Sequence, residues 1–456
     1  MVADQRFDVV VIGAGPAGEV CAGRLAEAGL TVAIVERELV GGECSYWACM
    51  PSKALLRPAQ LLAEVERVPG AREAVTGRLD VGSALRRRDE VIHDLDDASQ
   101  LPWLKQRGVV LVRGHGRFDG ERRVVVGDGT LTAERAVVVA VGSVASLPGI
   151  PGLSDAGAWT SREATTAKAA PESLIVLGGG VVAVELAQAW ATLGSRVTLV
   201  HRSGSLISRE EPFAREQVAA ALTGLGVELR LATPVRRVDR EATGGVAVEL
   251  EGGELLRADE LLVAAGRRPH TSDLGLETIG LAPGEAIAVD DHLQVAGAPW
   301  LLAIGDVNGR APLTHMGKYH ARIAADVIRG RAATVRDSGP PPRVIFTDPQ
   351  VAASGHTLAS AVDAGLDVQA VDVETAANAG ASFHGRNAPG TCRLVVDRGR
   401  RVLVGATFTG PDVAELVHSA TVAIAGAVPL DDLAHAVPTF PTRTEVWLGL
   451  LEQLER

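Results

Sequence analysis

Two cysteines lie close together near the N-terminus, in the segment GGECSYWACMPSK that spans residues 41–53. Cys44 and Cys49 are five residues apart, which on an ideal helix corresponds to about 7.5 Å along the axis. A disulfide prefers Cα atoms about 4.4–6.8 Å apart, so a bridge here requires a distorted turn and would be strained and easily reduced. The spacing therefore predicts a redox-active thiol pair.

A zinc site is the other use of a close cysteine pair. It needs a second ligand pair at a suitable spacing, and the sequence offers none, so we expect no bound metal. Pro51 and the lack of nearby histidines also favour a redox turn. A helix N-terminus at this place would lower the pKa of the thiols. Cys21 and Cys392 have no partner in the sequence, and we expect both to be small buried apolar residues.

Two glycine-rich loops indicate a second kind of chemistry, the binding of phosphate groups. The first reads GAGPAG over residues 13–18, and the second reads GGGVVA over residues 178–183. In such loops the first glycine permits a tight turn and the second lets the backbone approach a pyrophosphate. The third lets the helix pack on the strand, and alanine is tolerated there. The following helix offers N–H groups and a positive dipole end to the phosphates.

The residue that ends the next strand distinguishes the two loops. Glu36 lies 23 residues after Gly13, and His201 lies 23 residues after Gly178. A carboxylate at this place holds the ribose hydroxyls of an adenosine, which we expect of Glu36. It would repel a 2′-phosphate, whereas His201 and Arg202 would accept one, so the second loop is predicted to prefer NADPH over NADH. The alternative is that these side chains merely face solvent.

Apolar runs position both loops, as buried parallel strands require. Residues 7–12 and 31–35 enclose the first loop and its helix, and residues 174–177 and 196–200 enclose the second. This repeated strand–loop–helix–strand unit binds dinucleotides. Two copies indicate two dinucleotides, a tightly held flavin and a diffusing nicotinamide, with hydride transfer as the expected reaction class.

The rest of the chain has a different layout. A third apolar strand over residues 300–304 ends in Gly305 and Asp306, and three consecutive prolines, 340–342, indicate a linker. Beyond it we expect an α+β region of about 115 residues. Its predicted strands are residues 393–396 and 402–409, and its predicted helix is residues 411–427.

Composition and charge exclude several classes of partner. Of the 456 residues, 46% are apolar, so disorder is not expected. The net charge of −11, without a basic tail or stripe, argues against nucleic acid or an anionic membrane. No apolar run approaches the ~18 residues of a membrane span. Residues 1–6 lead directly into a strand and leave no room for a signal peptide, so a cytoplasmic protein is expected.

Seven motifs together carry a family resemblance. They are VVVIGAGPAG, GGECSYWACMPSK, IVLGGGVVAVELA, LLVAAGRRP, LLAIGDV, IFTDPQVAASG and FPTRTE. Over essentially its whole length the chain resembles the FAD-dependent pyridine nucleotide–disulfide oxidoreductases, in particular dihydrolipoamide dehydrogenases and mercuric reductases. The resemblance implies an α/β fold with two Rossmann-like domains, for FAD and NAD(P), and a C-terminal α+β dimerisation domain. The implied divisions are residues 1–150 and 271–335 for FAD, 151–270 for NAD(P), and 336–456 for dimerisation.

The resemblance also implies which residues contact the cofactors. FAD contacts are expected at Gly13, Gly15, Pro16, Ala17, Gly18, Glu36, Lys53, Gly116, Gly142, Gly305, Asp306 and Thr314. Among these, Lys53 would sit beside the flavin ring and pair with Glu185, and Thr314 would use its backbone. Contacts with the nicotinamide cofactor are expected at Gly178, Gly180, Val181, Val182, His201, Arg202, Gly266 and Arg267.

The implied mechanism assigns each cysteine a role. Hydride would pass from NAD(P)H to one face of the flavin, and Cys49 would be the flavin-proximal sulfur on the other face. Cys44 would be the outer thiol that meets the acceptor, by thiol–disulfide exchange. The enzyme would be a homodimer in which the C-terminus of each subunit completes the other active site.

The chain departs from the family at the catalytic base. The family usually ends in His-Pro-Thr-x-x-Glu, where the histidine shuttles a proton and the glutamate orients it. Here Glu445 is kept but Phe440 replaces the histidine. Loss of a general base costs about 10²- to 10⁴-fold, so an efficient lipoamide dehydrogenase is not expected. His435, His384 and Tyr46 are candidate substitutes, and the sequence does not choose among them.

Two further departures concern the acceptor. Mercuric reductases carry a tyrosine near the position that Phe440 occupies here, and a vicinal cysteine pair at the extreme C-terminus. This chain ends in LLEQLER and has neither feature. Tyr46 and Trp47 lie between the cysteines, where the family tends to have small or polar residues. They would shape a pocket for a flat acceptor by stacking, or else pack against the dimer partner.

Three functions remain open on the sequence alone. The first is an NAD(P)H-dependent FAD oxidoreductase with a redox-active Cys44–Cys49 pair. Its acceptor would be a quinone or other flat organic molecule, a metal ion or a specialised small disulfide. The second is a disulfide reductase of the lipoamide type with a substitute base. The third is a non-catalytic flavin-binding or partner-binding paralogue. The intact loops, both cysteines, Lys53 and Glu185 argue against it.

Overall fold

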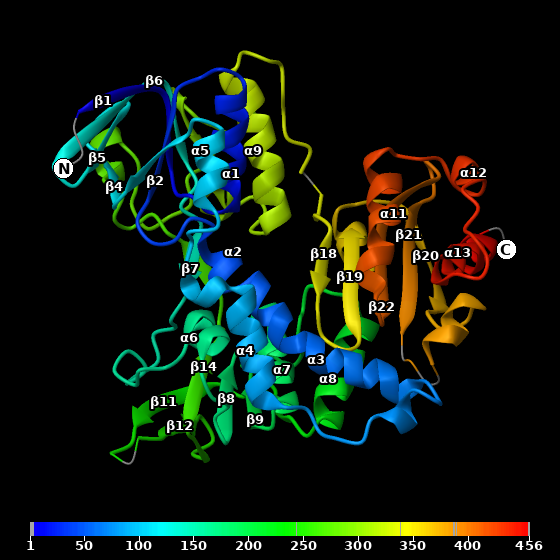
Figure 1. The fold of residues 1–456 in the computed structure, drawn as a ribbon. Coiled ribbons are helices and arrows are strands. Elements are labelled where there is room, and N and C mark those ends of the chain that lie inside the picture. Colours follow the sequence, from blue (N-terminus) through cyan, green and yellow to red (C-terminus); the bar gives the residue numbers. More distant parts are fainter. Residues whose placement is uncertain (1–3, 243, 338, 386–387, 389, 455–456) are drawn as a thin grey trace. The chain divides into compact units, whose positions relative to one another are not determined.

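The computed structural model describes residues 4–242, 244–337, 339–385, 388 and 390–454 (Figure 1). Its internal contacts divide the chain into two compact units. Unit 1 consists of Met1–Pro51, Arg88–Ser146 and Gly266–Ser338. Unit 2 consists of Ser52–Arg87, Leu147–Ala265 and Gly339–Arg456. Both units are therefore assembled from segments that are far apart in the sequence.

Unit 1 is built on an eight-stranded sheet with the order β16-β17-β6-β1-β2-β3, to which β5 and β4 are added beside β6. Its strands are β1 (Gln5–Ile12), β2 (Val32–Glu36), β3 (Val110–Arg113), β4 (Gly116–Phe118), β5 (Arg123–Val126), β6 (Gly129–Val139), β16 (Gln294–Val295) and β17 (Ala298–Ala303). Strand β1 pairs in parallel with β2 and β6, and β17 pairs in parallel with β6. A short antiparallel pair, β7 (Ser143–Ala145) and β15 (Arg267–Pro269), also belongs to this unit.

Two helices, α1 (Pro16–Glu27) and α9 (Thr314–Ile328), lie side by side on one face of this sheet (Figure 1). Val9, Val10 and Val11 at the centre of β1 are completely buried, as expected of a parallel strand covered on both faces. Unit 1 also contains α2 (Gly42–Tyr46) and α5 (Leu101–Gln106), and the helix α3 (Cys49–Arg67) begins there. The N-termini of α1 and α9 thus belong to one compact body.

Unit 2 contains three sheets. A four-stranded parallel sheet has the order β10-β9-β8-β14, with β8 (Ser173–Leu177), β9 (Arg196–Val200), β10 (Glu228–Arg230) and β14 (Glu260–Val263). Three antiparallel strands follow one another as β11 (Val235–Arg240), β12 (Val246–Leu250) and β13 (Leu255–Ala258). An antiparallel sheet has the order β18-β19-β22-β21-β20, with β18 (Arg343–Ile345), β19 (Gln350–Gly355), β20 (Val368–Glu374), β21 (Thr391–Asp397) and β22 (Val402–Gly410).

Helices cover these sheets. Helix α7 (Val181–Thr192) packs on β8 and β9, and α11 (Val413–Ala425) packs on β19 and β22. The other helices with residues in unit 2 are α4 (Val81–Val91), α6 (Ser161–Thr166), α8 (Pro212–Gly224), α10 (Leu358–Asp363), α12 (Leu430–Leu433) and α13 (Val446–Leu454). Over the described part of the chain, none of the helices has the length and apolarity that crossing a membrane requires.

The predicted α/β fold is confirmed, including both strand–loop–helix–strand units. Every predicted strand is present, as β1, β2, β8, β9, β17, β21 and β22. The predicted helix over residues 411–427 is present as α11 but is shorter at both ends. Asp412 has a positive φ of 53°, which a helix cannot continue through, and Gly426 follows the last helical residue. Residues 340–342 lie in neither helix nor strand, as a proline linker requires.

Candidate active site

The two neighbouring cysteines lie on different helices of unit 1. Cys44 is in α2, which ends at Tyr46, and Cys49 is the first residue of α3. Trp47 separates the helices with a φ of −132°. The segment between the cysteines is therefore distorted, as a bridge between them would require, and the distortion takes the form of a helix break. Both side chains are thiols, without a disulfide between them, and both are only partly exposed.

The start of α9 meets this pair. Thr314, the first residue of that helix, donates a hydrogen bond from its hydroxyl to the Cys44 sulfur at 3.2 Å. The same hydroxyl oxygen lies 3.5 Å from the Cys49 sulfur, where either group can be the donor. One threonine thus contacts both sulfurs. No local pattern marks this side chain, since it lies 270 residues from Cys44, and the family resemblance assigned a role only to its backbone.

The electrostatic setting of Cys44 corrects one expectation. The interaction with the Cys49 thiol and, next, burial raise the pKa of the Cys44 thiol above its ordinary value. The hydrogen bond from Thr314 and the positive charge of Lys318 act in the opposite direction without reversing the shift. The pKa of this thiol is therefore not lowered, as a helix N-terminus alone predicted. A group that lowers it would be valuable to a thiol chemistry at neutral pH.

The first glycine loop is held by a hydrogen bond to the carboxylate of Glu36, at the end of β2. The buried Glu36 accepts hydrogen bonds from the backbone N–H groups of Ala14 and Glu38, both at 2.7 Å. Burial raises the pKa of Glu36. Pro16 is the first helical residue of α1 and Gly15 its N-cap. A Cβ atom added to Gly15 would meet no described atom within 4 Å, which leaves room beside the helix N-terminus.

The other glycines of unit 1 show where the backbone is crowded or open. A Cβ on Gly116 would lie 3.1 Å from Val35 and 3.3 Å from Ile12, at the ends of β1 and β2. A Cβ on Gly142 would meet nothing within 4 Å, and Gly305 has a positive φ of 74°. Open space at two glycines and an uncapped helix N-terminus among the described residues fit a dinucleotide held along these strand ends. FAD bound there would supply hydride and electron transfer.

A polar network in unit 1 includes two predicted residues and one that was missed. Ser143 donates to Asp306 at 2.6 Å and accepts from the Nε of Arg267 at 2.8 Å. Arg267 also donates to the Ser143 carbonyl at 2.6 Å and lies 3.8 Å from the Glu43 carboxylate. Arg267 and Gly266 belong to unit 1, whereas the second glycine loop belongs to unit 2. Ser143 follows Gly142 directly, and only its contacts single it out.

Within unit 2, Lys53 and Glu185 form an ion pair. The Lys53 ammonium lies 2.7 Å from a Glu185 oxygen and 4.9 Å from the centre of the Phe346 ring. The other oxygen of the buried Glu185 accepts from the Phe346 N–H at 2.8 Å. Lys53 is on α3, Glu185 on α7 and Phe346 after β18, so three elements fix the ammonium. A carboxylate buried with two partners holds a lysine in one orientation.

The His201 ring packs against the backbone of the second glycine loop. A Cβ on Gly179 would lie 2.4 Å from the His201 ring, so the imidazole packs on the loop. Burial and, to a smaller extent, Arg202 lower the pKa of His201, so the ring is neutral at physiological pH. Arg202 is exposed. Gly180 is the N-cap of α7, with Val181 and Val182 in its first turn and open space at Gly180.

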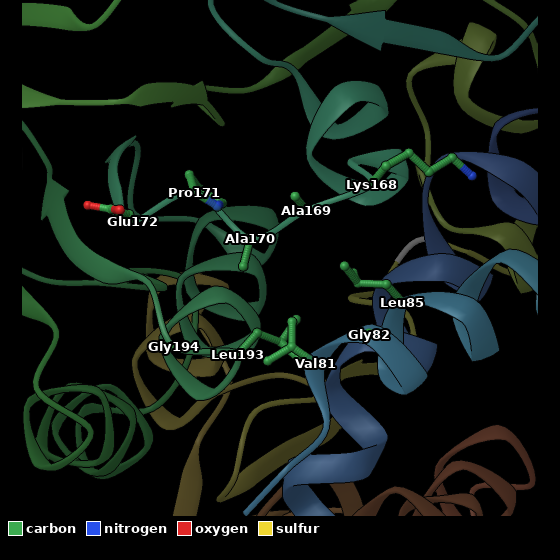
Figure 2. A pocket seen from close by; sticks show the side chains of 10 residues that line it. All are labelled: Val81, Gly82, Leu85, Lys168, Ala169, Ala170, Pro171, Glu172, Leu193 and Gly194. Carbon is green, nitrogen blue, oxygen red and sulfur yellow. The ribbon is translucent and has the colours of Figure 1, made fainter.

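A pocket of about 430 Å³ lies at the other end of α7 (Figure 2). It is lined by Val81, Gly82, Leu85, Lys168, Ala169, Ala170, Pro171, Glu172, Leu193 and Gly194. Leu193 and Gly194 follow the C-terminal end of α7, whereas the glycine loop precedes its N-terminal end. A helix of 12 residues is about 18 Å long. The pocket is therefore separate from the dinucleotide loop, and none of the predicted site residues lines it.

At the C-terminal segment, Phe440 is 76% exposed and Glu445 accepts from the Gly380 N–H at 3.3 Å. Of the candidate substitute bases, His435 is exposed and His384 lies with Glu64 and Asp412 in a group whose ligand atoms are within 4.8 Å of one another. The Arg443 guanidinium, 3.7 Å from Asp412, opposes a metal ion there.

The third candidate base, Tyr46, is almost completely buried in unit 1. Burial raises the pKa of its phenol to about 12. Its hydroxyl has no hydrogen-bond partner within the described residues. Such a phenol neither gains nor loses a proton readily at neutral pH, so Tyr46 is poorly suited to replace the histidine. Cys21 and Cys392 are completely buried, as predicted.

Comparisons with known proteins agree with this geometry. Residues 7–321 match the family model for pyridine nucleotide-disulphide oxidoreductases, and residues 341–450 match the dimerisation domain of the same family. The chain is 34% identical to a mercuric reductase of Acidithiobacillus ferrooxidans, over 97% of this chain and 81% of that protein. It is also 34% identical to dihydrolipoyl dehydrogenase 3 of Pseudomonas aeruginosa, over 97% of this chain and 96% of that protein.

The fold has a close counterpart among solved structures. The Cu(II) complex of the HOCl-induced flavoprotein disulfide reductase RclA from Escherichia coli superposes with a TM-score of 0.87 at 27% identity, covering 99% of this chain and 100% of that one. These relatives support an enzyme that uses FAD and a pyridine nucleotide, and the dimerisation domain supports a homodimer. The chain belongs to the pyridine nucleotide-disulphide oxidoreductases.

Proposed function

We propose that this enzyme passes a hydride from NADPH through FAD to the Cys44–Cys49 pair, or directly to an acceptor other than lipoamide. The acceptor would be a quinone, a metal ion or a specialised small disulfide. The observation that carries the proposal is the juxtaposition of both thiols at Thr314 in a chain whose position 440 holds an exposed phenylalanine. The thiols are arranged for exchange, while the proton shuttle needed for lipoamide is missing.

Each of the candidate site residues would have a defined role in binding FAD or in transferring electrons. Glu36 and the N-terminus of α1 would hold the adenosine and pyrophosphate of FAD. Gly116, Gly142, Asp306 and the Thr314 backbone would hold the remainder of FAD. Lys53, oriented by Glu185, would place a positive charge beside the flavin ring. Cys49 would be the sulfur that receives electrons, and Cys44 the sulfur that meets the acceptor.

The preference for NADPH is also a proposal. Because the pKa of His201 is lowered, the ring is a packing group on Gly179 and not a cation at neutral pH. The charge that would meet a 2′-phosphate is then that of the exposed Arg202. Residues 151–270 would form the NAD(P)-binding domain, between FAD-binding segments 1–150 and 271–335. Residues 336–456 would form the dimer interface. Use of the intracellular NADPH pool would place the enzyme in the cytoplasm.

An anaerobic titration with NADPH, followed by absorbance, tests the proposal. We expect uptake of about two reducing pairs per flavin, with a long-wavelength thiolate–flavin band at the intermediate stage. The same titration with NADH is the comparison. Uptake of only about one pair with simple bleaching would show that the cysteines take no part. The enzyme would then reduce quinone-like acceptors directly.

A second candidate is a dihydrolipoamide dehydrogenase with a substitute base. It is favoured by the relative of that name from Pseudomonas aeruginosa, which matches nearly the whole chain. The two candidates differ in turnover with dihydrolipoamide and NAD⁺. We expect a rate about 10²- to 10⁴-fold below that of a histidine-containing enzyme. Replacing Phe440 with histidine should restore part of that loss if the base is all that is missing.

A further inference from the structure

We propose that the Thr314 hydroxyl relays a proton between the Cys44 and Cys49 sulfurs, so that the negative charge passes from one sulfur to the other without a histidine. The inference deepens the proposed function and rests on it, because a relay is needed only if the cysteine pair is oxidised and reduced during turnover.

The geometry at Thr314 is that of a two-sided hydrogen-bond partner. A threonine hydroxyl has one O–H donor and two acceptor lone pairs. Here the donor is directed to the Cys44 sulfur at 3.2 Å. The oxygen is 3.5 Å from the Cys49 sulfur and can accept the S–H proton of that thiol. Both sulfurs are therefore joined through one oxygen atom.

The proton transfer balances without any other reactant. In the reduced pair that carries one proton, the S–H bond of Cys49 breaks as a new O–H bond forms on Thr314. The original O–H bond of Thr314 breaks as an S–H bond forms on Cys44. No electrons are exchanged with another group, Thr314 is regenerated, and the negative charge moves from Cys44 to Cys49. The reverse transfer recreates the Cys44 thiolate, which is the attacking form in thiol–disulfide exchange.

The charges around the pair favour such a device. Lys318 lies four residues after Thr314 on α9, about one helical turn away. Its charge and the Thr314 hydrogen bond are the two influences that lower the pKa of the Cys44 thiol. They oppose the Cys49 thiol and burial, which raise it. The thiolate at Cys44 therefore depends on α9 for its stability.

Other charged groups from the elements packed around Cys44 are already engaged with one another. Glu43 on α2 lies 3.8 Å from Arg267, the first residue of β15 in unit 1. Glu19 on α1 interacts with Lys318, and that interaction lowers the pKa of Glu19 against the larger effect of burial. Among the described residues, the Thr314 hydroxyl lies within hydrogen-bond distance of both sulfurs.

Two substitutions at one position test the relay. Thr314→Val removes the hydroxyl but keeps the branched shape and the backbone, and Thr314→Ser keeps the hydroxyl. In stopped-flow reduction with NADPH, the rate at which the long-wavelength band of the Cys49 thiolate forms is compared, within each protein, with the rate at which the flavin of that protein bleaches. Relative to bleaching, this band should form about tenfold more slowly in Thr314→Val, because the path that carries the proton from Cys49 to Cys44 is lost. Thr314→Ser should restore the rate.

A second measurement does not depend on the flavin. The protein is reduced with dithiothreitol, freed of it, and alkylated with iodoacetamide across a pH series, with the product at Cys44 identified by mass spectrometry. Thr314→Val should be alkylated about tenfold more slowly at neutral pH, with a profile moved to higher pH by about one unit. Thr314→Ser should follow the wild-type profile. This arm applies even if Thr314→Val purifies without flavin.

The outcomes separate the relay from the function on which it rests. If the wild-type protein takes up one reducing pair and shows no long-wavelength band, the cysteines do not cycle, so the relay is wrong and the proposed function loses its thiol step. If the wild-type band forms and Thr314→Val matches it in rate and in alkylation profile, the relay alone is wrong. If Thr314→Val is slow and Thr314→Ser is equally slow, the role is one of packing, which also overturns the relay.

Discussion

The two dinucleotide loops have the same backbone conformation but differ in the side chains that surround them. Gly13 and Gly178 both have positive φ, at 101° and 139°. A Cβ on Gly13 would lie 2.5 Å from the carbonyl oxygen of Ala140, and a Cβ on Gly178 would lie 2.3 Å from that of Ala264. Both carbonyls follow the last residue of the neighbouring strand. In both loops the second glycine faces open space. The duplication seen in the sequence therefore extends to the contacts of single backbone atoms.

Three positions break this equivalence. Gly18 in the first loop corresponds to Ala183 in the second, the acidic residue Glu19 to the buried Val184, and Glu36 to His201. The first loop thus has a tighter helix–strand contact and a carboxylate that binds its own backbone. The second has a methyl group at the contact and an imidazole lying on the loop. We infer that the first is built to hold one cofactor permanently and the second to exchange another.

The largest effect on stability should come from giving the first loop, at its third glycine, the alanine that the second loop has there. A Cβ on Gly18 would lie 1.9 Å from the Gly13 carbonyl oxygen, which is backbone and cannot move aside easily. Gly18→Ala should therefore lower the free energy of unfolding by about 3 kcal/mol or more. It should also reduce the flavin-to-protein ratio of the purified enzyme. Urea unfolding and the absorbance ratio of flavin to protein measure both effects.

The reverse change in the second loop is the matched control. Ala183→Gly removes a methyl group from a buried position in α7 and should cost about 1 kcal/mol, mainly through helix propensity. It should leave the flavin content unchanged. Equal losses of stability for the two variants would contradict the difference in helix–strand contact between the loops.

The next effect concerns Glu19, whose counterpart is Val184. Burial raises the pKa of Glu19 to about 7, partly opposed by Lys318 and reinforced by Glu36. A carboxyl group with a raised pKa in the folded state stabilises the protein below its unfolded pKa, and this contribution is lost as pH rises through the folded pKa. The wild-type free energy of unfolding should therefore fall by about 2 to 3 kcal/mol between about pH 4.5 and pH 7.5 from this group.

Glu19→Gln should abolish that part of the pH dependence, so the variant should be the more stable protein above neutral pH. Glu27→Gln, at the exposed end of the same helix, is the control and should leave the curve unchanged. Thermal or urea unfolding at a series of pH values provides the comparison. Parallel curves for wild type and Glu19→Gln would mean that Glu19 is ionised in the folded protein as readily as in the unfolded chain.

The structural features behind these predictions differ in how well they can be predicted from the sequence alone. The loops and strands could be predicted because each depends on local signals, an apolar run before a glycine such as Gly13 and a charged residue such as Glu36 at a fixed distance after it. The burial of Glu19 could not, because it depends on neighbours in other segments, including Lys318 on a helix nearly 300 residues later. Sequence distance hides such contacts.

The thiol site shows the same limit. The cysteines and the distortion between them were expected from the spacing, but the position of the helix break at Trp47 could not be predicted from it. The lowered pKa expected of Cys44 was wrong because the Cys49 thiol and burial outweigh the effects of α9. The Thr314 hydroxyl contact and the Ser143–Arg267 bond join residues 270 and 124 positions apart. No local pattern predicts such pairs.

The smallest effect should come from the residues that end the second strand. Replacing His201 with Glu and Arg202 with Ala should lower the ratio of kcat/KM for NADPH over NADH about tenfold or more, about 1.4 kcal/mol. A carboxylate repels the 2′-phosphate and the cation that would bind it is gone. Because the lowered pKa of His201 leaves its ring neutral at physiological pH, Arg202→Ala alone should produce most of the loss.

The single variants sharpen this division of roles. Arg209→Ala removes another exposed arginine from the same connection and should leave the cofactor ratio unchanged. His201→Ala should change the KM for both cofactors similarly at neutral pH, because the ring it removes packs on Gly179 and not on a phosphate. In the wild type, the preference for NADPH should increase as the pH falls and His201 gains a proton. A cofactor ratio unmoved by the double substitution would refute the NADPH assignment. A preference carried by His201 alone at neutral pH would show that the imidazole is charged in place.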